Sequence, residues 1–348
     1  MILMIKGESM NTSKKAILIF VLLLMVIAGQ LCAQRRGQGG QLIFTLASLV
    51  PEATPWGAAL NRMAAEWEAA TNGEIRLIIH HGGVAGDEAE VLRKLRLNEI
   101  QAAVFTSIGL RSVVPELMTV SYPFLLRDDA ELDLVLSIIK PELDARAQQN
   151  GFVTLTWAKA GWIRIFSRAP VFTPADLRRQ RLGCSPDDQE ILQAFRAMGF
   201  QVVPVNITDT LVSLRSGMVD AVYWSPVAAA AAQIFGIANH MSTMNLAPFL
   251  GGILMNQTAW RRIPERHRPR LLEITRQIGN ELDNAITRLD AEAIATMARH
   301  GLIINEPSPQ QRQEWYAEIN RHESRLIPIF NRELYQKIIP ILETHRGR

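Results

Sequence analysis

The chain has 348 residues, of which 48% are hydrophobic and 20% are charged, and its formal net charge is +3. At about 150 residues per domain, this length predicts about two domains, and the apolar share excludes a largely disordered chain. The arginines are scattered rather than clustered, which disfavours binding to nucleic acid.

The N-terminal segment has the pattern of an export signal. Lys14 and Lys15 precede the apolar run 16–29, which the letters L-C-A-Q follow. A charged start before an apolar stretch of about 7–15 residues is typical of a secretory signal peptide and is short for a membrane span. We therefore expect residues 1–33 to be a signal peptide and the protein to be periplasmic.

Two alternatives concern how the exported chain is anchored. Cys32 could carry a lipid, although Leu31 is larger than the residue that precedes a lipidated cysteine, and the signal could stay uncleaved as an anchor. We expect residues 34–40 to form a flexible tether. If Cys32 leaves with the signal, Cys184 is the one remaining cysteine, so the core must fold without an internal disulfide.

The first half of the exported chain alternates strands and helices. Strand-like segments cover 41–48, 74–80 and 101–106. Thr54-Pro55 predicts the start of one helix, and Asp87 predicts the start of the next. The resulting βαβαβ order indicates a parallel sheet with right-handed crossovers.

A second run of the same kind follows Gly161. It contains four predicted strands, at 162–167, 180–184, 202–205 and 218–223, with helices between them. From Pro264 the pattern changes, because residues 268–299 form one long helical stretch, and shorter ones start at Ser308 and Ile329.

These patterns predict an α/β protein with two lobes, each an open and mostly parallel sheet flanked by helices, and a long helix that spans both lobes. Its expected parts are lobe one (41–160 plus about 249–267), lobe two (161–248 plus parts of 300–330), the spanning helix (268–300) and a C-terminal helix (329–348). In such sheets, ligands bind beyond the carboxyl ends of strands.

Signatures of catalysis are missing from the sequence. It has no phosphate-binding loop, no H-E-x-x-H, no G-x-S-x-G and no C-x-x-C. His80 and His81 are adjacent in a strand and point to opposite faces, so a shared metal ion is disfavoured. Asp187 and Asp188 favour helix capping over acid–base work. We interpret Asp220, inside an apolar strand, as structural.

Two side chains stand out as ligand contacts. Trp224 follows a strand and precedes Ser225-Pro226, where an aromatic ring can form the wall of a pocket, with core packing as the alternative. Arg164 lies within the strand W-I-R-I-F, where it either reaches solvent or offers a fixed guanidinium to a carboxylate.

Five segments in chain order resemble the solute-binding proteins of TRAP transporters (the DctP type). They are LASLVPEATPWGAAL, AATNGEIRLIIHHGGVAGDEAEVLRKL, PELMTVSYPFLL, GWIRIFSRAPVFTPADL and LRSGMVDAVYWSP. The resemblance implies a two-lobed periplasmic-binding-protein fold hinged around a long helix. It also implies a receptor that delivers a small organic ligand, usually a carboxylate, to permease subunits driven by an ion gradient.

In that family two arginines commonly hold the carboxylate. Arg164 keeps the first, in a G-x-R pattern, whereas the second pattern, K-I-R, reads R-L-G here, with Arg181 at the lysine position and Gly183 at the arginine position. Tyr223 replaces a glutamate before Trp224. Losing a charge-assisted pair would weaken carboxylate binding by about 1.5–3 kcal/mol per hydrogen bond, so we expect a less polar or uncharged ligand.

Four alternatives stay open for this site and for its function. Arg181 could restore the carboxylate clamp, because side chains at 181 and 183 share a face of a regular strand. Gly183 could serve only a tight turn into Ser185-Pro186. The scaffold could also belong to an exported enzyme that uses Asp187, Asp220 or His81, or to a sensory binding protein.

The same matching places further residues at the ligand. They are Ser48, Asp87, Thr106, Ser107 and Asn206. The expected partners are the small molecule, the permease subunits and, in some systems, a periplasmic helical-repeat protein. We expect no cofactor, no metal and a monomer.

Overall fold

The computed structural model describes residues 41–347. The predicted signal peptide 1–33, with Cys32, and the predicted tether 34–40 lie outside the described residues. The strands are β1 (Leu42–Ala47), β2 (Ile75–His80), β3 (Ala102–Thr106), β4 (Phe152–Ser167), β5 (Arg181–Cys184), β6 (Gln201–Pro204), β7 (Ala221–Trp224), β8 (His240–Ser242), β9 (Ala247–Asn256) and β10 (Ile303–Asn305).

Helices flank these strands along the whole described chain. The α-helices are α2 (Pro55–Ala70), α3 (Glu88–Arg96), α4 (Ser107–Leu110), α5 (Asp129–Gln149), α6 (Pro174–Arg178), α7 (Gln189–Ala197), α8 (Thr210–Arg215), α9 (Pro226–Ala231), α10 (Gln257–Arg262), α11 (Arg268–Arg299), α12 (Pro309–Leu326) and α13 (Arg332–His345). Short 3₁₀ helices are η1 (Pro115–Ser121), η2 (Ile207–Asp209), η3 (Ile234–Gly236) and η4 (Ile327–Ile329).

Two predicted helix starts are confirmed by their capping bonds. The Thr54 hydroxyl accepts a hydrogen bond from the Gly57 amide at 3.1 Å, and Pro55 takes the first position of α2. The Asp87 carboxylate accepts one from the Glu90 amide at 2.8 Å at the start of α3. Both caps satisfy amides that the first helical turn leaves without a partner.

The strands form one continuous sheet, in the order β2-β1-β3-β9-β4-β7-β5-β6, with β8 paired to β4 and β10 to β8. β1, β2 and β3 are parallel and belong to lobe one; β5, β6 and β7 are parallel and belong to lobe two. The two-lobed α/β prediction is confirmed. The sequence did not reveal that β9 and the first part of β4 join the lobes.

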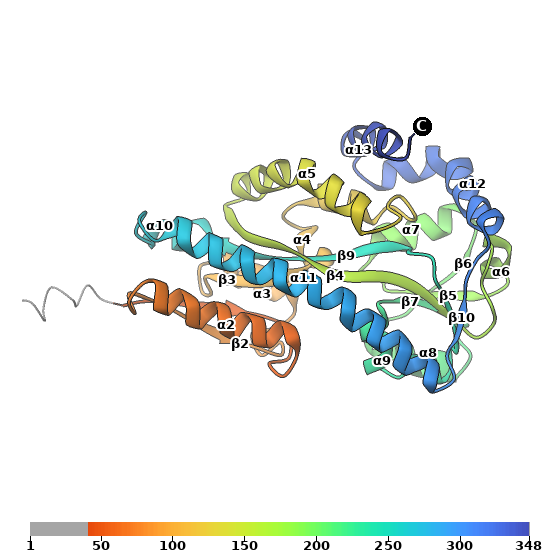
Figure 1. Cartoon of the computed structure of the whole chain (residues 1–348), viewed down its shortest axis with the longest axis horizontal. Coiled ribbons are helices and arrows are strands. Elements are labelled where there is room, and N and C mark those ends of the chain that lie inside the picture. The colour runs from red at the N-terminus through yellow and green to blue at the C-terminus, as the bar shows by residue number, and fades with distance from the viewer. Residues whose placement is uncertain (1–40, 348) are drawn as a thin grey trace, which may run out of the picture.

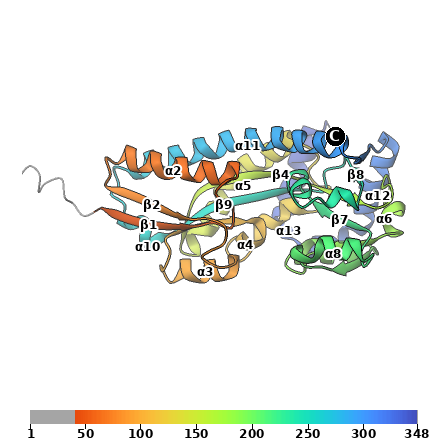
Figure 2. The same ribbon diagram turned by 90° about the horizontal axis from the view of Figure 1, so that it is seen from below.

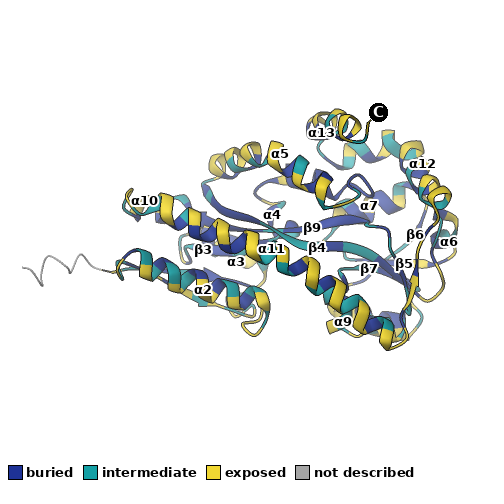
Figure 3. Cartoon of the chain, viewed as in Figure 1, coloured by how far each residue is buried: buried dark blue, intermediate teal, exposed yellow. Residues whose placement is uncertain are grey.

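β4 and β9 are the long strands that connect the two ends of the sheet. β4 pairs antiparallel with β9 from Phe152 to Ile163 and then with β7 from Arg164 to Ser167. Their side chains are mostly buried, as Figure 3 shows for the strands between the helices. β9 is a near-continuous apolar run from Ala247 to Met255, which explains why alternation did not reveal it.

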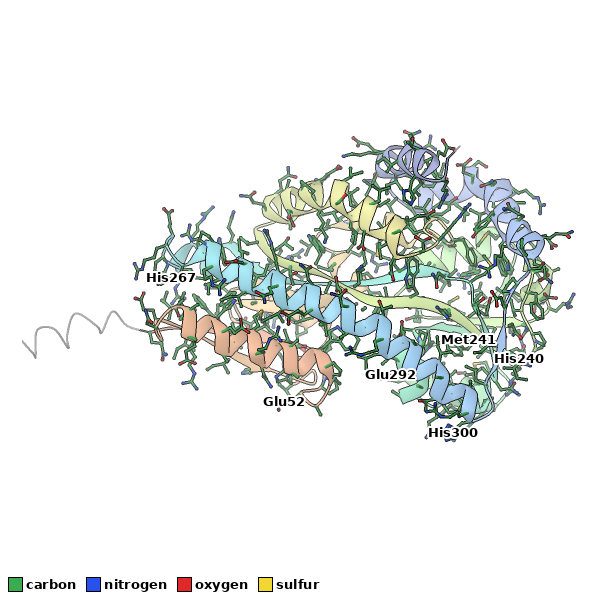
Figure 4. All side chains as sticks on the ribbon, viewed as in Figure 1. Glu52, His240, Met241, His267, Glu292 and His300 are labelled. Carbon is green, nitrogen blue, oxygen red and sulfur yellow. The ribbon has the colours of Figure 1, made fainter. Side chains whose placement is uncertain are left out.

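Helix α11 spans both lobes, as predicted, and it has the predicted bounds. Figure 1 shows it running the length of the sheet, and Figure 4 marks His267 just before its start and His300 just after its end, near β8. Its 32 residues correspond to about 48 Å. The indole of Trp67 in α2 donates a buried hydrogen bond to the Thr275 hydroxyl of α11 at 3.0 Å.

The two faces of the sheet carry different helices. Figure 2 shows α2 and α11 on one side of the strands and α3, α4 and α8 on the other. The C-terminal helices α12 and α13 pack beside α5 and α7. The indole of Trp315 in α12 contacts Phe124 at 4.9 Å and Phe200 at 6.1 Å between ring centroids, so α12 packs against residues of both lobes.

β4 is irregular where it passes between the lobes. The register with β9 shifts between Lys159 and Trp162, and Gly161 has a φ of +94° there. A Cβ at Gly161 would lie 2.5 Å from Oδ2 of Asp290, a buried carboxylate of α11. Asp290 also accepts a hydrogen bond from the Val227 amide of α9 at 3.3 Å. This point therefore needs glycine for its backbone and for its space.

We expect Gly161→Ala to lower the free energy of unfolding by about 2–3 kcal/mol, because it adds a strained φ and displaces Asp290. Gly199→Ala is the matched control: Gly199 has a φ of +77° but no atom within 4 Å of a Cβ. It should cost only the backbone strain, about 1–2 kcal/mol. Urea denaturation of both variants measures the difference, and equal losses would contradict the role assigned to Asp290.

Candidate functional site

A cavity of about 220 Å³ lies where the two lobes meet. Lobe one contributes Ser107 and Ile108 of α4 and Met118 and Ser121 of η1. Lobe two contributes the ends of β5 and β7 and the starts of α7, α8 and α9. The segment 246–249, where β9 begins, completes the wall. The volume lies just below the range of about 300–1,000 Å³ that holds drug-sized ligands, so the cavity suits a small molecule.

The cavity wall is predominantly apolar. Its aliphatic and aromatic members are Ile108, Met118, Ile163, Ile191, Val205, Ile207, Val222, Trp224, Leu246 and Phe249. Among the residues 41–347, those that line it include no arginine, lysine or histidine. Its polar members are the serine and threonine hydroxyls, the Tyr223 phenol and one carboxylate, that of Asp188. The wall can therefore exclude water from an apolar ligand but offers no cationic side chain to an anion.

Asp188 is held at the cavity by α7 and β7. It stands at the N-cap position of α7, as predicted, but its side chain makes no capping hydrogen bond of regular geometry. Instead its Oδ2 accepts a hydrogen bond from the Tyr223 hydroxyl at 3.1 Å. Its Oδ1 is buried and has no hydrogen-bond partner within the described part of the chain.

The surroundings of Asp188 disfavour its charge. Burial raises the pKa of this carboxyl from 3.8 to about 6, against the hydrogen bond from Tyr223, which lowers it. Glu190 raises the pKa further, while the nearby Ile191 amide and the Arg111 guanidinium lower it. Burial also raises the pKa of Tyr223 well above 10, so its hydroxyl keeps the proton that it donates.

Gly183 lines the cavity from within β5, and its φ is not in the left-handed region. The tight-turn interpretation is therefore wrong, because the backbone here is ordinary strand. A Cβ at this position would lie 3.3 Å from a methyl group of Val219 and another of Val222. These valines crowd the space where a side chain at 183 would begin, so any larger residue there requires them to shift by a few tenths of an ångström.

Arg164 shares a face of the sheet with Gly183 but does not line the cavity. It lies directly opposite Trp224 in the antiparallel pairing of β4 and β7, and opposite residues of such a pair point to the same face. Burial lowers the pKa of its guanidinium, and the charge of Asp290 raises it. Its Nε is buried without a hydrogen-bond partner among residues 41–347.

Arg181 lies away from the cavity and already has a carboxylate partner. Its Nε and Nη2 donate to Oδ2 and Oδ1 of Asp220 at 2.7 and 2.9 Å. Asp220 precedes β7 and is partly exposed, which corrects its predicted place inside that strand but agrees with a structural role. The bidentate pair holds Arg181 at the start of β5, whereas the cavity opens at its end.

Four other predicted residues lie near strand ends but do not line the cavity. The hydroxyl of Ser48 accepts a hydrogen bond from the Val50 amide at 3.1 Å, and Thr106 donates its hydroxyl to Glu88 Oε2 at 2.8 Å. Asp87 caps α3, and exposed Asn206 donates to Asp209 Oδ2 at 3.3 Å. Each side chain has a partner within the protein, which sequence matching could not distinguish from contact with a ligand.

The structure therefore brings together Ser107, Gly183, Tyr223 and Trp224 from the predicted set. Sequence reasoning missed Asp188 as a cavity residue and missed the apolar walls from η1 and from 246–249. The segment PELMTVSYPFLL was noticed for its resemblance, yet nothing in it marked Met118 and Ser121 as cavity residues.

None of the helices within residues 41–347 combines the length and the apolar character needed to cross a membrane. Over the same residues, no group of three or more His, Cys, Asp or Glu side chains could hold a metal ion. His81, one member of the histidine pair, contacts Asn61 Oδ1 through its Nε2 at 2.9 Å.

Comparison with known proteins identifies relatives of this chain. It is 24% identical over 251 residues to a solute-binding protein of Verminephrobacter eiseniae (strain EF01-2), covering 71% of this chain and 74% of that one. It is 21% identical to the C4-dicarboxylate-binding protein DctB of Bacillus subtilis (strain 168), with 88% of each chain covered.

Solved structures share the fold. A TRAP periplasmic solute-binding protein of Chromohalobacter salexigens with bound D-glucuronate has a TM-score of 0.76 at 18% identity, over 86% of this chain and 98% of that one. One from Ralstonia eutropha H16 with bound (S)-2-acetolactate has a TM-score of 0.76 at 20% identity, over 87% and 99%. The family model described as bacterial extracellular solute-binding protein, family 7, matches residues 46–325. The chain belongs to this family, the DctP-type solute receptors of TRAP transporters.

Proposed function

We propose that the protein is an exported receptor that captures a small, mostly apolar organic molecule between its lobes and delivers it to TRAP-type permease subunits. The observation that carries the proposal is the interlobe cavity, whose wall comes from both lobes and contains no cationic side chain among the described residues. A ligand enclosed by both lobes favours the closed state, since it gains contacts there that the open state lacks.

An ion pair across the lobes supports this closing mechanism. Arg111, which follows α4 of lobe one, donates from Nη1 to Glu190 Oε2 of α7 at 3.0 Å. Both side chains are partly buried, at 29% and 16% exposed. The pair forms beside the cavity, so it can stabilise the closed arrangement without contacting the ligand.

The polarity of the ligand is argued from what the site lacks. DctB is named a C4-dicarboxylate-binding protein, and the two structural neighbours hold glucuronate and acetolactate, all of which carry carboxylates. In this chain Gly183 offers no side chain, Arg181 is paired with Asp220, and Arg164 lies outside the cavity wall. A carboxylate in this cavity would lack the charge-assisted partners that offset its desolvation.

The alternative of an exported enzyme receives no support from this geometry. Asp187 is exposed, Asp220 is paired with Arg181, and His81 contacts Asn61. None of the three lines the cavity, whereas a nucleophile and a base would have to meet there. Export by the predicted signal peptide, a helical-repeat partner, a monomeric state and a sensory role stay predictions.

The proposal is tested by native mass spectrometry of gently purified protein, followed by denaturing extraction of the bound molecule. We expect a compound without a carboxylate, and we expect succinate and D-glucuronate to leave the melting temperature of ligand-free protein nearly unchanged. Recovery of a dicarboxylate or hexuronate, or strong stabilisation by either acid, would falsify the proposed ligand class while leaving the receptor role intact.

The interlobe ion pair gives a second prediction. Arg111→Met should shift the closing equilibrium toward the open state by about fivefold, because a partly buried pair contributes about 1 kcal/mol. Small-angle X-ray scattering should then give a larger radius of gyration than that of the unmodified protein. Arg270→Met is the control, because Arg270 pairs with Glu273 within α11. An unchanged radius for Arg111→Met would remove the pair from the closing mechanism.

A further inference from the structure

Asp188 presents an unused acceptor to the cavity. Its Oδ2 receives the hydrogen bond from Tyr223, but its Oδ1 is buried without a partner among the described residues. Buried polar atoms are nearly always hydrogen-bonded in folded proteins, so an exception needs an explanation. Because Asp188 lines the cavity, a ligand can supply the missing donor.

The groups that face Asp188 compensate its charge only in part, although the Ile191 amide of α7 and the Arg111 guanidinium both lower its pKa. Glu190, on the same helix, adds a second negative charge. Arg111 is the cation that acts on Asp188, but it is already paired with Glu190 at 3.0 Å. The neutral neighbours are Tyr223 from β7 and the buried thiol of Cys184 from β5, and Cys184 in turn feels the charge of Arg196. The polar end of the cavity is therefore electronegative.

We propose that Asp188, positioned by Tyr223, is the anchor for a cationic nitrogen, so that the receptor takes small apolar amines rather than organic acids. The inference rests on the proposed function, because it places the ligand in the interlobe cavity. An ammonium N–H can donate to the free Oδ1 while Tyr223 keeps its bond to Oδ2. Charge-assisted bonds of this kind are about twice as strong as neutral ones.

The rest of the wall fits the same ligand class. The aromatic rings of Trp224 and Phe249 line the cavity and can contact either a hydrocarbon group or a cation. Ser107 and Ser121 reach the cavity from lobe one and can accept the remaining N–H bonds of an ammonium. A carboxylate would instead meet the like charge of Asp188, which raises the cost of binding it.

The experiment compares three probes that differ only in their head group. Benzylamine, benzyl alcohol and benzoate are titrated by calorimetry at pH 7.5 into ligand-free protein and into Asp188→Asn, Tyr223→Phe and Asp187→Asn. We expect benzylamine to bind about 10- to 100-fold more tightly than either other probe, which corresponds to one hydrogen bond to a charged group. Asp188→Asn should remove this preference, whereas Asp187→Asn, next to it but exposed, should keep it.

The outcomes separate this inference from the proposed function. Equal binding of benzylamine and benzyl alcohol, an unchanged preference in Asp188→Asn, or no binding of benzylamine at millimolar concentration overturns the amine anchor. If benzyl alcohol still binds better than benzoate, the proposal of a ligand without a carboxylate survives. If benzoate binds most tightly, both fail.

A measurement without any ligand tests the same carboxylate. The native pKa of Asp188 is about 6, above the 3.8 of an unperturbed aspartate, so the native state binds more protons than the unfolded state between those values. The stabilising contribution of the protonated carboxyl is therefore lost as the pH rises through about 4 to 6. We expect the melting temperature of Asp188→Asn, relative to the unmodified protein, to rise across this window and to level off above it.

Benzylamine should reduce the melting-temperature difference between Asp188→Asn and the unmodified protein at pH 7.5, because an ammonium beside Asp188 compensates the charged form. A melting-temperature difference that is the same at pH 4 and pH 7.5 would show that the protein already compensates the charge of Asp188 in full, and the inference would fail without any binding result.

Discussion

The antiparallel pairing of β4 with β9 is the constraint on which the rest of the structure depends. β4 pairs with β9 through lobe one and then with β7 in lobe two, so the two lobes share one backbone ladder. The irregularity at Gly161 lets β4 change register without breaking the sheet. Asp290 of α11 accepts a bond from α9 at this point, which fixes the long helix against the junction. The cavity lies beside this connection between the lobes, at the ends of β5 and β7 and the start of β9.

The character of the cavity follows from a few residues placed on that shared frame. β5 and β7 are parallel neighbours, with Gly183 in register with Val222, so their ends deliver side chains to the same place. Gly183 in β5 leaves room for methyl groups of Val222 in β7 and of Val219 just before it, and the wall becomes apolar. The bidentate pair of Arg181 with Asp220 stabilises the opposite ends of the same two strands. Position 183 thus brings no cationic side chain to the cavity, and Arg181 forms a structural ion pair with Asp220 instead.

The elements with strong local signals could be predicted from the sequence. Thr54 and Asp87 cap the helices that they were expected to cap, and α11 has its predicted bounds, because capping chemistry and helical periodicity are local properties. The pairing of β4 with β9 between the lobes could not be predicted, since β9 is apolar almost throughout and has no alternation to detect. The resemblance of the G-x-R pattern likewise did not reveal that Arg164 is not among the residues that line the cavity.

Asp188 shows why local rules fail at the site itself. An aspartate before a helix is favoured as a cap, and by that rule its side chain belongs to its own backbone. Here it turns to Tyr223, which is distant in sequence, and leaves an oxygen free. An apolar wall contributes about 25 cal/mol of binding free energy per Å² of apolar ligand surface that it buries, whatever the shape of the hydrocarbon. Such a wall therefore discriminates weakly among small ligands. A buried carboxylate whose charge is only partly compensated discriminates more strongly, because a ligand that brings the missing donor stabilises it. Under the proposed function, the specificity of the receptor would therefore depend most on Oδ1 of Asp188.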